Sequence, residues 1–126
     1  MEWKKASIEI VDLYERVIKN YICEKRQMFG FPVSFINNNM FAGVFEDGIF
    51  MRLNPADKEA ILKEFDETSP FTPMGRTMKE YVFGPGSLFE IPDFCDKWLG
   101  KSYAFVSSLP PKEKGTKQKK SPKKAT

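Results

Sequence analysis

Apolar residues recur with a helical period near the start of the chain and again near its end. Within residues 6–25 they repeat at spacings of three, four and seven, the pattern of a helix that packs on a core. They are Ile10, Val11, Tyr14, Val17, Ile18, Tyr21 and Ile22. Residues 92–109 carry a second such stripe, formed by Phe94, Trp98, Leu99, Phe105, Val106 and Leu109. A shorter helix is predicted at residues 54–65, because Asn54 suits an N-cap and Pro55 suits the first helical position.

Between the helices predicted at residues 6–25 and 54–65 the pattern changes to a period of two, which predicts β-strands. Strands are predicted at residues 31–36, 40–45 and 49–53, separated by the asparagines at 37–39 and by Asp47-Gly48. Asp-Gly is a strong hairpin signal, because a type I′ turn needs a positive φ at both central residues. A fourth strand is predicted at residues 78–83.

Together these elements predict an α+β fold. It consists of an N-terminal helix, an antiparallel β-meander with a fourth strand, and two further helices packed on one face of the sheet. Residues 1–109 form the single predicted domain, and residues 110–126 form a tail that is predicted to be disordered because it lacks large apolar side chains.

Two-residue turns predict which side chains share a face of the sheet, since side chains alternate along a strand. The face expected to receive the helices carries Val33, Phe35, Ala42, Val44, Met51 and Leu53. The opposite face carries a row in which Gly43 lies between Ser34 and Arg52. Beside that row it carries four large apolar side chains, Ile36, Phe41, Phe45 and Phe50.

Arg52 is the main candidate for chemistry in this row. Gly43 leaves room for the long side chain, and a guanidinium between Phe rings suits a carboxylate or a phosphate. The alternative is that Arg52 pairs with an acidic side chain of its own subunit, its stem covering the rings. Arg76, Lys79 and Tyr81 are further anion-binding candidates. A lysine on an edge strand also serves as ordinary protection against aggregation.

The chain is rich in aromatic residues, with eighteen in 126 residues, twelve of them phenylalanine. Two interpretations are open: a large core, or an apolar face shared between two copies of the chain. On the second interpretation Ile36, Phe41, Phe45 and Phe50 are the candidate dimer face.

The absence of histidine excludes His-based triads and most catalytic zinc sites. The two cysteines, Cys23 and Cys95, lie in helical patterns and are predicted to be buried free thiols. No catalytic residue, metal site or cofactor is predicted. The opening residues lack the hydrophobic stretch of a signal peptide, and no apolar run approaches the roughly 18 residues of a membrane span. A cytoplasmic protein without membrane contact is therefore expected.

Charge is divided unevenly along the sequence. Residues 110–126 carry seven lysines and one glutamate, a net charge of +6, which leaves −3 for residues 1–109. The lysines are Lys112, Lys114, Lys117, Lys119, Lys120, Lys123 and Lys124. They suit either weak, salt-sensitive contact with nucleic acid or a solubilising terminus.

Several short motifs, in this order and spacing, make residues 27–112 resemble the N-terminal domain of the TfoX/Sxy family. The motifs are Met28-Phe29-Gly30, Met40-Phe41-Ala42, Arg52-Leu53, Pro70-Phe71 with Pro73-Met74, Met78-Lys79-Glu80-Tyr81, and Trp98. One departure is Phe31, where the family commonly has a second glycine.

The resemblance implies an α+β fold, often dimeric, and a role in controlling DNA-uptake genes beside the cyclic-AMP receptor protein. It supplies no established catalytic residues. We therefore expect a non-enzymatic regulatory or accessory protein that acts through protein contacts, as a homodimer, with the transcription machinery as a candidate partner. The alternatives are a nucleic-acid-associated protein that uses its tail, and a domain that binds or transforms a small anionic ligand around Arg52.

Overall fold

The computed structural model of the chain describes residues 6–111, except for the side chain of Met74. The helices are α1 (Ile8–Ile18), α2 (Pro55–Glu64), α3 (Gly86–Phe89) and α4 (Pro92–Ser108), with a 3-10 turn, η1 (Pro73–Gly75). The strands are β1 (Glu24–Met28), β2 (Phe31–Ile36), β3 (Asn39–Phe45), β4 (Gly48–Arg52), β5 (Ser69–Pro70) and β6 (Tyr81–Pro85). The tail lysines, predicted to be disordered, lie outside the described residues.

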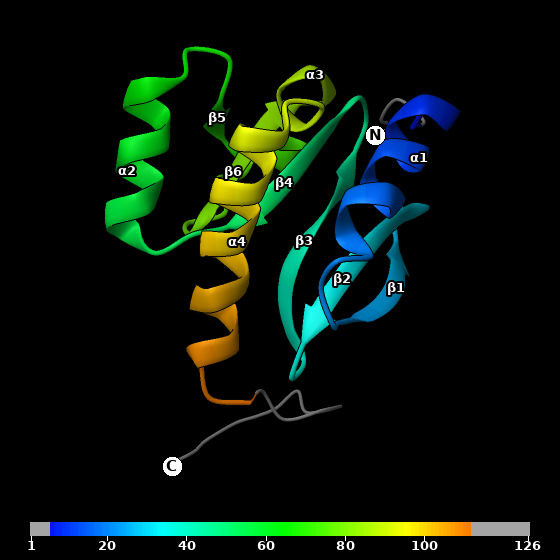
Figure 1. Cartoon of the computed structure of the whole chain (residues 1–126), viewed down its shortest axis with the longest axis horizontal. Helices are drawn as coiled ribbons and strands as arrows, with labels where there is room; N and C mark the ends of the chain where they lie inside the picture. Colours follow the sequence, from blue (N-terminus) through cyan, green and yellow to red (C-terminus); the bar gives the residue numbers. More distant parts are fainter. Residues whose placement is uncertain (1–5, 112–126) are drawn as a thin grey trace.

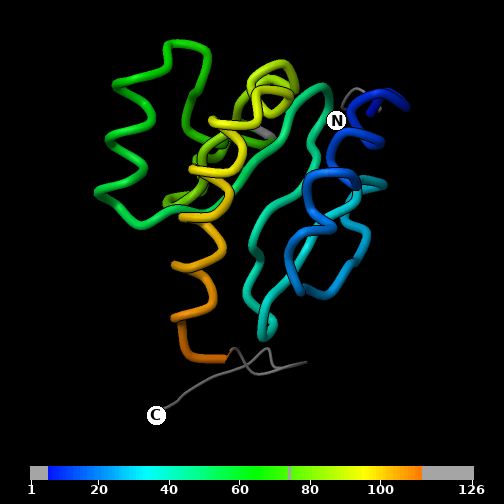
Figure 2. Tube along the Cα trace, viewed as in Figure 1, coloured from blue at the N-terminus to red at the C-terminus, as the bar shows by residue number. Residues whose placement is uncertain are grey.

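The six strands form one antiparallel sheet in the order β1-β2-β3-β4-β6-β5. Helices α1 and α4 lie against the same face of this sheet, where both contact β3 and β4 (Figures 1 and 2). Helix α2 stands beside β6, and the short α3 connects β6 to α4. The α+β fold with helices on one sheet face is therefore confirmed.

Two predicted helices match the structure closely. The Asn54 side chain accepts a hydrogen bond from the backbone N–H of Asp57 at 2.8 Å, which caps α2 as expected. Helix α4 buries Phe94, Trp98, Leu99 and Val106, the stripe read from the sequence.

The first helix is shorter than predicted, and its supposed last turn belongs to the sheet. Helix α1 ends at Ile18, and Glu24–Met28 forms β1, an edge strand that the sequence pattern did not indicate. Its side chains are largely exposed, so burial leaves no alternating apolar signal there. Cys23 therefore lies in the connection between α1 and β1, where it is only half-buried.

The other boundary corrections lie around β6. Met78 to Glu80 form a turn, in which the Tyr81 N–H donates to the Met78 carbonyl at 3.1 Å. The strand therefore starts later than predicted and continues through Gly84 and Pro85. Strand β5 and helix α3 were not predicted.

The predicted register across β3 and β4 is wrong by two residues. Gly43 is opposite Phe50, not Arg52, because the turn is Glu46-Asp47 and Gly48 already belongs to β4. A Cβ on Gly48 would lie 2.4 Å from the Gly84 carbonyl oxygen and 2.4 Å from the Phe83 ring. This glycine therefore lets β6 approach β4 closely. In the turn itself, Glu46 takes a positive φ of 53°.

A bulge also shifts the register between β2 and β3. Ser34 is opposite Ala42, but the next residue, Phe35, is opposite Met40, so Phe41 is the extra residue on β3. Ser34 consequently does not face Gly43; Val33 does. The turn is Asn37-Asn38, with φ values of 52° and 67°.

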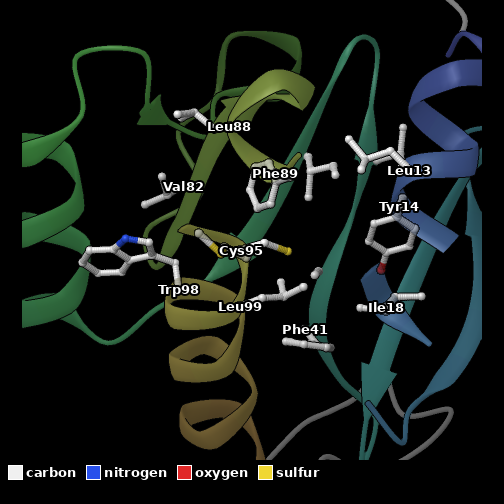
Figure 3. Close-up of a cluster of buried hydrophobic side chains, with 14 of the residues drawn as sticks. Leu13, Tyr14, Ile18, Phe41, Val82, Leu88, Phe89, Cys95, Trp98 and Leu99 are labelled. Atoms are coloured by element: carbon white, nitrogen blue, oxygen red, sulfur yellow. The ribbon is translucent and has the colours of Figure 1, made fainter. Parts of the chain in front are cut away.

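These shifts change which side chains meet the helices. Phe41 is fully buried in the core beneath α1 and α4 (Figure 3). Ile36 packs against the same core. Ser34 also faces the helices, where its hydroxyl shares a 2.6 Å hydrogen bond with the Tyr14 hydroxyl. Burial raises the Tyr14 pKa well above its usual value.

The predicted apolar row on the opposite face is therefore only partly correct. Gly43, Phe45 and Phe50 belong there, whereas Ile36, Phe41 and Ser34 do not. Val33 and Phe35, expected beneath the helices, pack in the cluster on this second face.

Candidate functional site

The second face of the sheet, opposite α1 and α4, is partly covered by the chain itself. Its buried cluster consists of Val33, Phe50, Phe71 and Tyr81. Phe71 comes from the connection between β5 and β6 and stacks on Phe50, with ring centroids 4.3 Å apart and planes 11° apart. Backbone hydrogen bonds fix this connection: the Phe71 N–H donates to Tyr81 and the Met78 N–H donates to Phe71. Phe50 is thereby only 1% exposed.

Beside this cover the second face is hollowed into an apolar groove of about 490 Å³. We call it the methionine groove. Its lining residues come from β1, the β1–β2 turn, β3 and the β5–β6 connection. They are Met28, Phe29, Met40, Phe45, Phe71, Pro73, Arg76 and Met78. Three thioethers and three aromatic rings make its walls apolar and adaptable in shape.

Phe29 forms one wall from an unusual backbone position. Phe29 and Gly30 are the two turn residues between β1 and β2, with φ values of 57° and 84°, the pattern of a type I′ turn. Glycine, asparagine and aspartate dominate such positions, and a bulky residue there costs about 1 kcal/mol of strain. The Phe29 side chain is nevertheless 55% exposed.

Arg76 is the only charged residue among the described residues that line the groove. It follows η1, whose Gly75 takes a φ of 79°, and its own N–H donates to the Pro73 carbonyl. The side chain is exposed, and its guanidinium makes no hydrogen bond or ion pair with any residue from 6 to 111. A guanidinium at the rim of an apolar hollow suits a carboxylate or phosphate group of a ligand.

Arg52 is occupied by its own chain. Its Nη2 and Nε lie 2.7 and 2.8 Å from Glu80 Oε1, and its guanidinium lies near the rings of Tyr81 and Phe105. Of the two interpretations of Arg52, the structure therefore shows the acidic partner within the same subunit. An anion at this guanidinium would have to displace Glu80.

The remaining anion-binding candidates do not meet in one place. Lys79 is exposed in the turn before β6, and not on the strand predicted at residues 78–83. The Tyr81 ring is buried, and its hydroxyl donates to the Met40 carbonyl at 2.9 Å. Burial raises the Tyr81 pKa to about 12. Ser34 lies on the helix side and Gly43 is filled over by Val33 and Phe50, so Arg76 alone reaches the methionine groove.

The corrected strand register also changes the candidate dimer face. Ile36 and Phe41 pack beneath the chain's own helices, and Phe71 covers Phe50. Of the four residues, only Phe45 lines the groove. The homodimer itself stays a prediction.

Nucleophilic and metal chemistry find little support in the part of the chain that is described. Burial raises the Cys95 pKa to about 11, which keeps this thiol protonated at neutral pH. Within residues 6–111, no three cysteine, aspartate or glutamate side chains gather in a way that could hold a metal ion.

Sequence patterns predict few of the residues that line the groove. Arg76 is predicted as an anion-binding cation and Phe45 as an apolar face residue, whereas Met28, Phe29 and Met40 enter only as parts of the family motifs and are not predicted to line a common surface. One available signal is Gly30 directly before the alternating segment at residues 31–36, since an isolated glycine at the start of a strand pattern favours a turn.

Comparison with known proteins identifies the family of this chain. The family model of the TfoX N-terminal domain matches residues 21–106, which is more than half of the chain. The chain belongs to the TfoX N-terminal domain family. The matched segment includes every residue of the methionine groove and leaves out α1.

Two other comparisons bear on this protein. None of the curated proteins and none of the solved structures matches the chain significantly. In the described part of the chain, no helix has the length and apolar character needed to cross a membrane.

Proposed function

We propose that this TfoX-family protein is a non-enzymatic regulator of DNA-uptake genes that acts by contacting another protein. The family membership supports the regulatory role. The observation that carries the contact is the methionine groove, an apolar hollow on the sheet face that α1 and α4 leave uncovered. Exposed apolar patches bounded by polar residues commonly mark interaction sites.

A deletion and complementation experiment tests this function. Loss of the gene from the organism that carries it is expected to lower transcripts of the DNA-uptake genes and the transformation frequency at least tenfold. The wild-type chain restores both. A Phe29→Asp variant fails to restore them, because a carboxylate in the apolar wall opposes an apolar contact.

Ile22→Asp is the matched control for this experiment. Ile22 is 88% exposed, and it lies outside the groove, so its replacement by aspartate makes a similar chemical change elsewhere. Ile22→Asp is expected to complement like the wild type. Unchanged transcripts in the deletion strain contradict the regulatory role, and full complementation by Phe29→Asp contradicts a contact through the groove.

A second candidate function rests on the composition of residues 110–126. Seven lysines there suit non-specific contact with nucleic acid, which depends steeply on salt. We expect the full chain to bind duplex DNA weakly, with a dissociation constant of roughly 10⁻⁴–10⁻⁶ M at physiological salt. Replacing all seven lysines with glutamine should abolish binding in a fluorescence-anisotropy titration across a salt series. Binding that survives this replacement places the DNA contact on residues 1–109.

A further inference from the structure

We propose that the methionine groove binds a short apolar segment of a partner protein that carries a carboxylate, and that Arg76 pairs with this carboxylate. The inference rests on the proposed function, because it states the chemistry of the partner at the same site. It follows from three features: the apolar walls, the cation Arg76 at the rim, and the position of Phe29.

The walls select an apolar side chain of adaptable shape. Met28, Met40 and Met78 contribute three flexible thioethers, and methionine-rich surfaces adjust to different apolar ligands. Phe45 and Phe71 contact each other edge to face at a centroid distance of 5.4 Å and form the firm part of the lining. The volume of about 490 Å³ lies within the range of about 300–1,000 Å³ that is usual for ligand sites.

The charge at the rim selects an anion. Among the described residues that line the groove, Arg76 is the only charged one and none is a carboxylate, and its guanidinium has no partner within residues 6–111. Residues 1–109 have a net charge of −3, so this cation stands out on a mildly acidic domain. A guanidinium next to apolar surface pairs well with a carboxylate, because both are partly removed from water there.

Phe29 forms an accessible wall of the groove from a turn position with positive φ. A left-handed turn position suits asparagine or glycine, and a half-exposed phenylalanine contributes less to the core than a buried one. Phe29 is placed to close over an apolar segment that lies in the groove.

An extended protein segment fits the groove better than an enclosed small molecule. One wall is a two-residue turn and another is the β5–β6 connection, so the groove is built along the surface of the sheet. Phe29, itself 55% exposed, leaves that wall accessible from outside. A segment that enters and leaves along the sheet therefore needs no opening of the fold.

A peptide selection tests the proposal with the full chain. A phage-displayed library of random twelve-residue peptides is panned on the immobilised protein, and the enriched sequence is synthesised with a fluorescent label. We expect enriched peptides to combine large apolar residues with an aspartate or glutamate. Fluorescence polarisation then measures their affinity for the wild type and for variants whose fold is checked by circular dichroism.

Two substitutions locate the carboxylate contact. Arg76→Met is expected to weaken binding at least tenfold, and changing the acidic residue of the peptide to its amide is expected to do the same. Combining both changes should cause little further loss, since each removes the same pair. Lys79→Met is the matched control: it removes an exposed cation that lies outside the groove lining, and should change the affinity less than twofold.

Several results would overturn the proposal. They are the failure of any peptide to be enriched, enrichment without an acidic residue, and binding that Arg76→Met leaves unchanged. Displacement of the labelled peptide by decanoate at lower concentration than by unlabelled peptide would identify a small carboxylate as the occupant. A dimer in analytical ultracentrifugation that Phe29→Asp converts to monomer would identify a second copy.

The peptide-binding experiment and the gene deletion test separate claims, so either can fail while the other succeeds. Peptide binding without any effect of the deletion on transcripts would leave the groove chemistry intact and reject the regulatory role. An effect on transcripts without peptide binding would reject the occupant proposed here and keep the regulator.

Discussion

Replacing Phe50 with alanine is expected to lower the free energy of unfolding by about 3–5 kcal/mol, the range for deletion of a fully buried ring. The Phe50 ring is 1% exposed. It stacks on Phe71 and meets the Tyr81 ring edge-on at a centroid distance of 6.0 Å. Removing it leaves a cavity between the sheet and the β5–β6 connection, because the backbone hydrogen bonds at Phe71 limit how far that connection can collapse.

The same substitution should damage the methionine groove. Phe71 lines the groove and its ring face stacks on Phe50, so the wall loses its support when Phe50 is truncated. Peptide affinity is therefore expected to fall together with stability, although Phe50 itself does not line the groove. This couples the packing of the second face to the proposed contact with a partner.

Urea unfolding followed by circular dichroism measures the change. Phe29→Ala is the comparison, since it removes an equally large ring that is 55% exposed, and its cost should stay below about 1 kcal/mol. If Phe50→Ala costs no more than Phe29→Ala, the stacked connection does not stabilise the fold as the geometry indicates.

The parts of the fold that sequence patterns predicted are those governed by local rules. Helix α2 follows from its Asn54 cap and Pro55, and α4 follows from an apolar stripe of four turns. Strand β1 follows from neither, because an exposed edge strand is fixed by backbone pairing with β2 and carries a mostly polar sequence.

The predicted register is wrong where a glycine makes room for a neighbouring strand instead of forming a turn. Asp47-Gly48 has the sequence of a hairpin turn, yet Gly48 lies in β4 because β6 packs against its backbone. No local pattern shows that β6 will lie there. The bulge at Phe41 acts in the same way: one extra residue turned that side chain from the predicted dimer face into the helix core.

The candidate site was harder to predict than the fold. Arg76 could be named because a cation in a Pro/Gly-rich connection is conspicuous, whereas the groove around it arises only when a turn, two strands and a connection come together. The interpretation of Arg52 as a ligand-binding residue depends on the predicted register. In the structure its partner is Glu80, the residue that precedes β6. The sequence thus shows which side chains can bind an anion, but it does not show which residues lie beside them in the fold.

Gly43 supplies the last prediction, in which two glycine-to-alanine changes have opposite signs. A Cβ at Gly43 would lie 2.6 Å from Val33 Cγ1 and 2.7 Å from Phe50 Cζ. Both side chains are 1% exposed, and valine has little rotamer freedom to move aside. Gly43→Ala is therefore expected to destabilise the protein by about 1–3 kcal/mol, as overpacking of a filled core does.

Gly100→Ala is the matched counterpart, within α4. Within residues 6–111 a Cβ there would meet only the Tyr21 hydroxyl, at an ordinary 3.8 Å, so alanine gains helix propensity without a clash. It should raise the free energy of unfolding by about 0.5–1 kcal/mol. Denaturant midpoints compared at equal slope measure both changes. A neutral or stabilising Gly43→Ala would show that Val33 and Phe50 yield to the new methyl group, and the absence of a side chain at Gly43 would then have no role in packing this face.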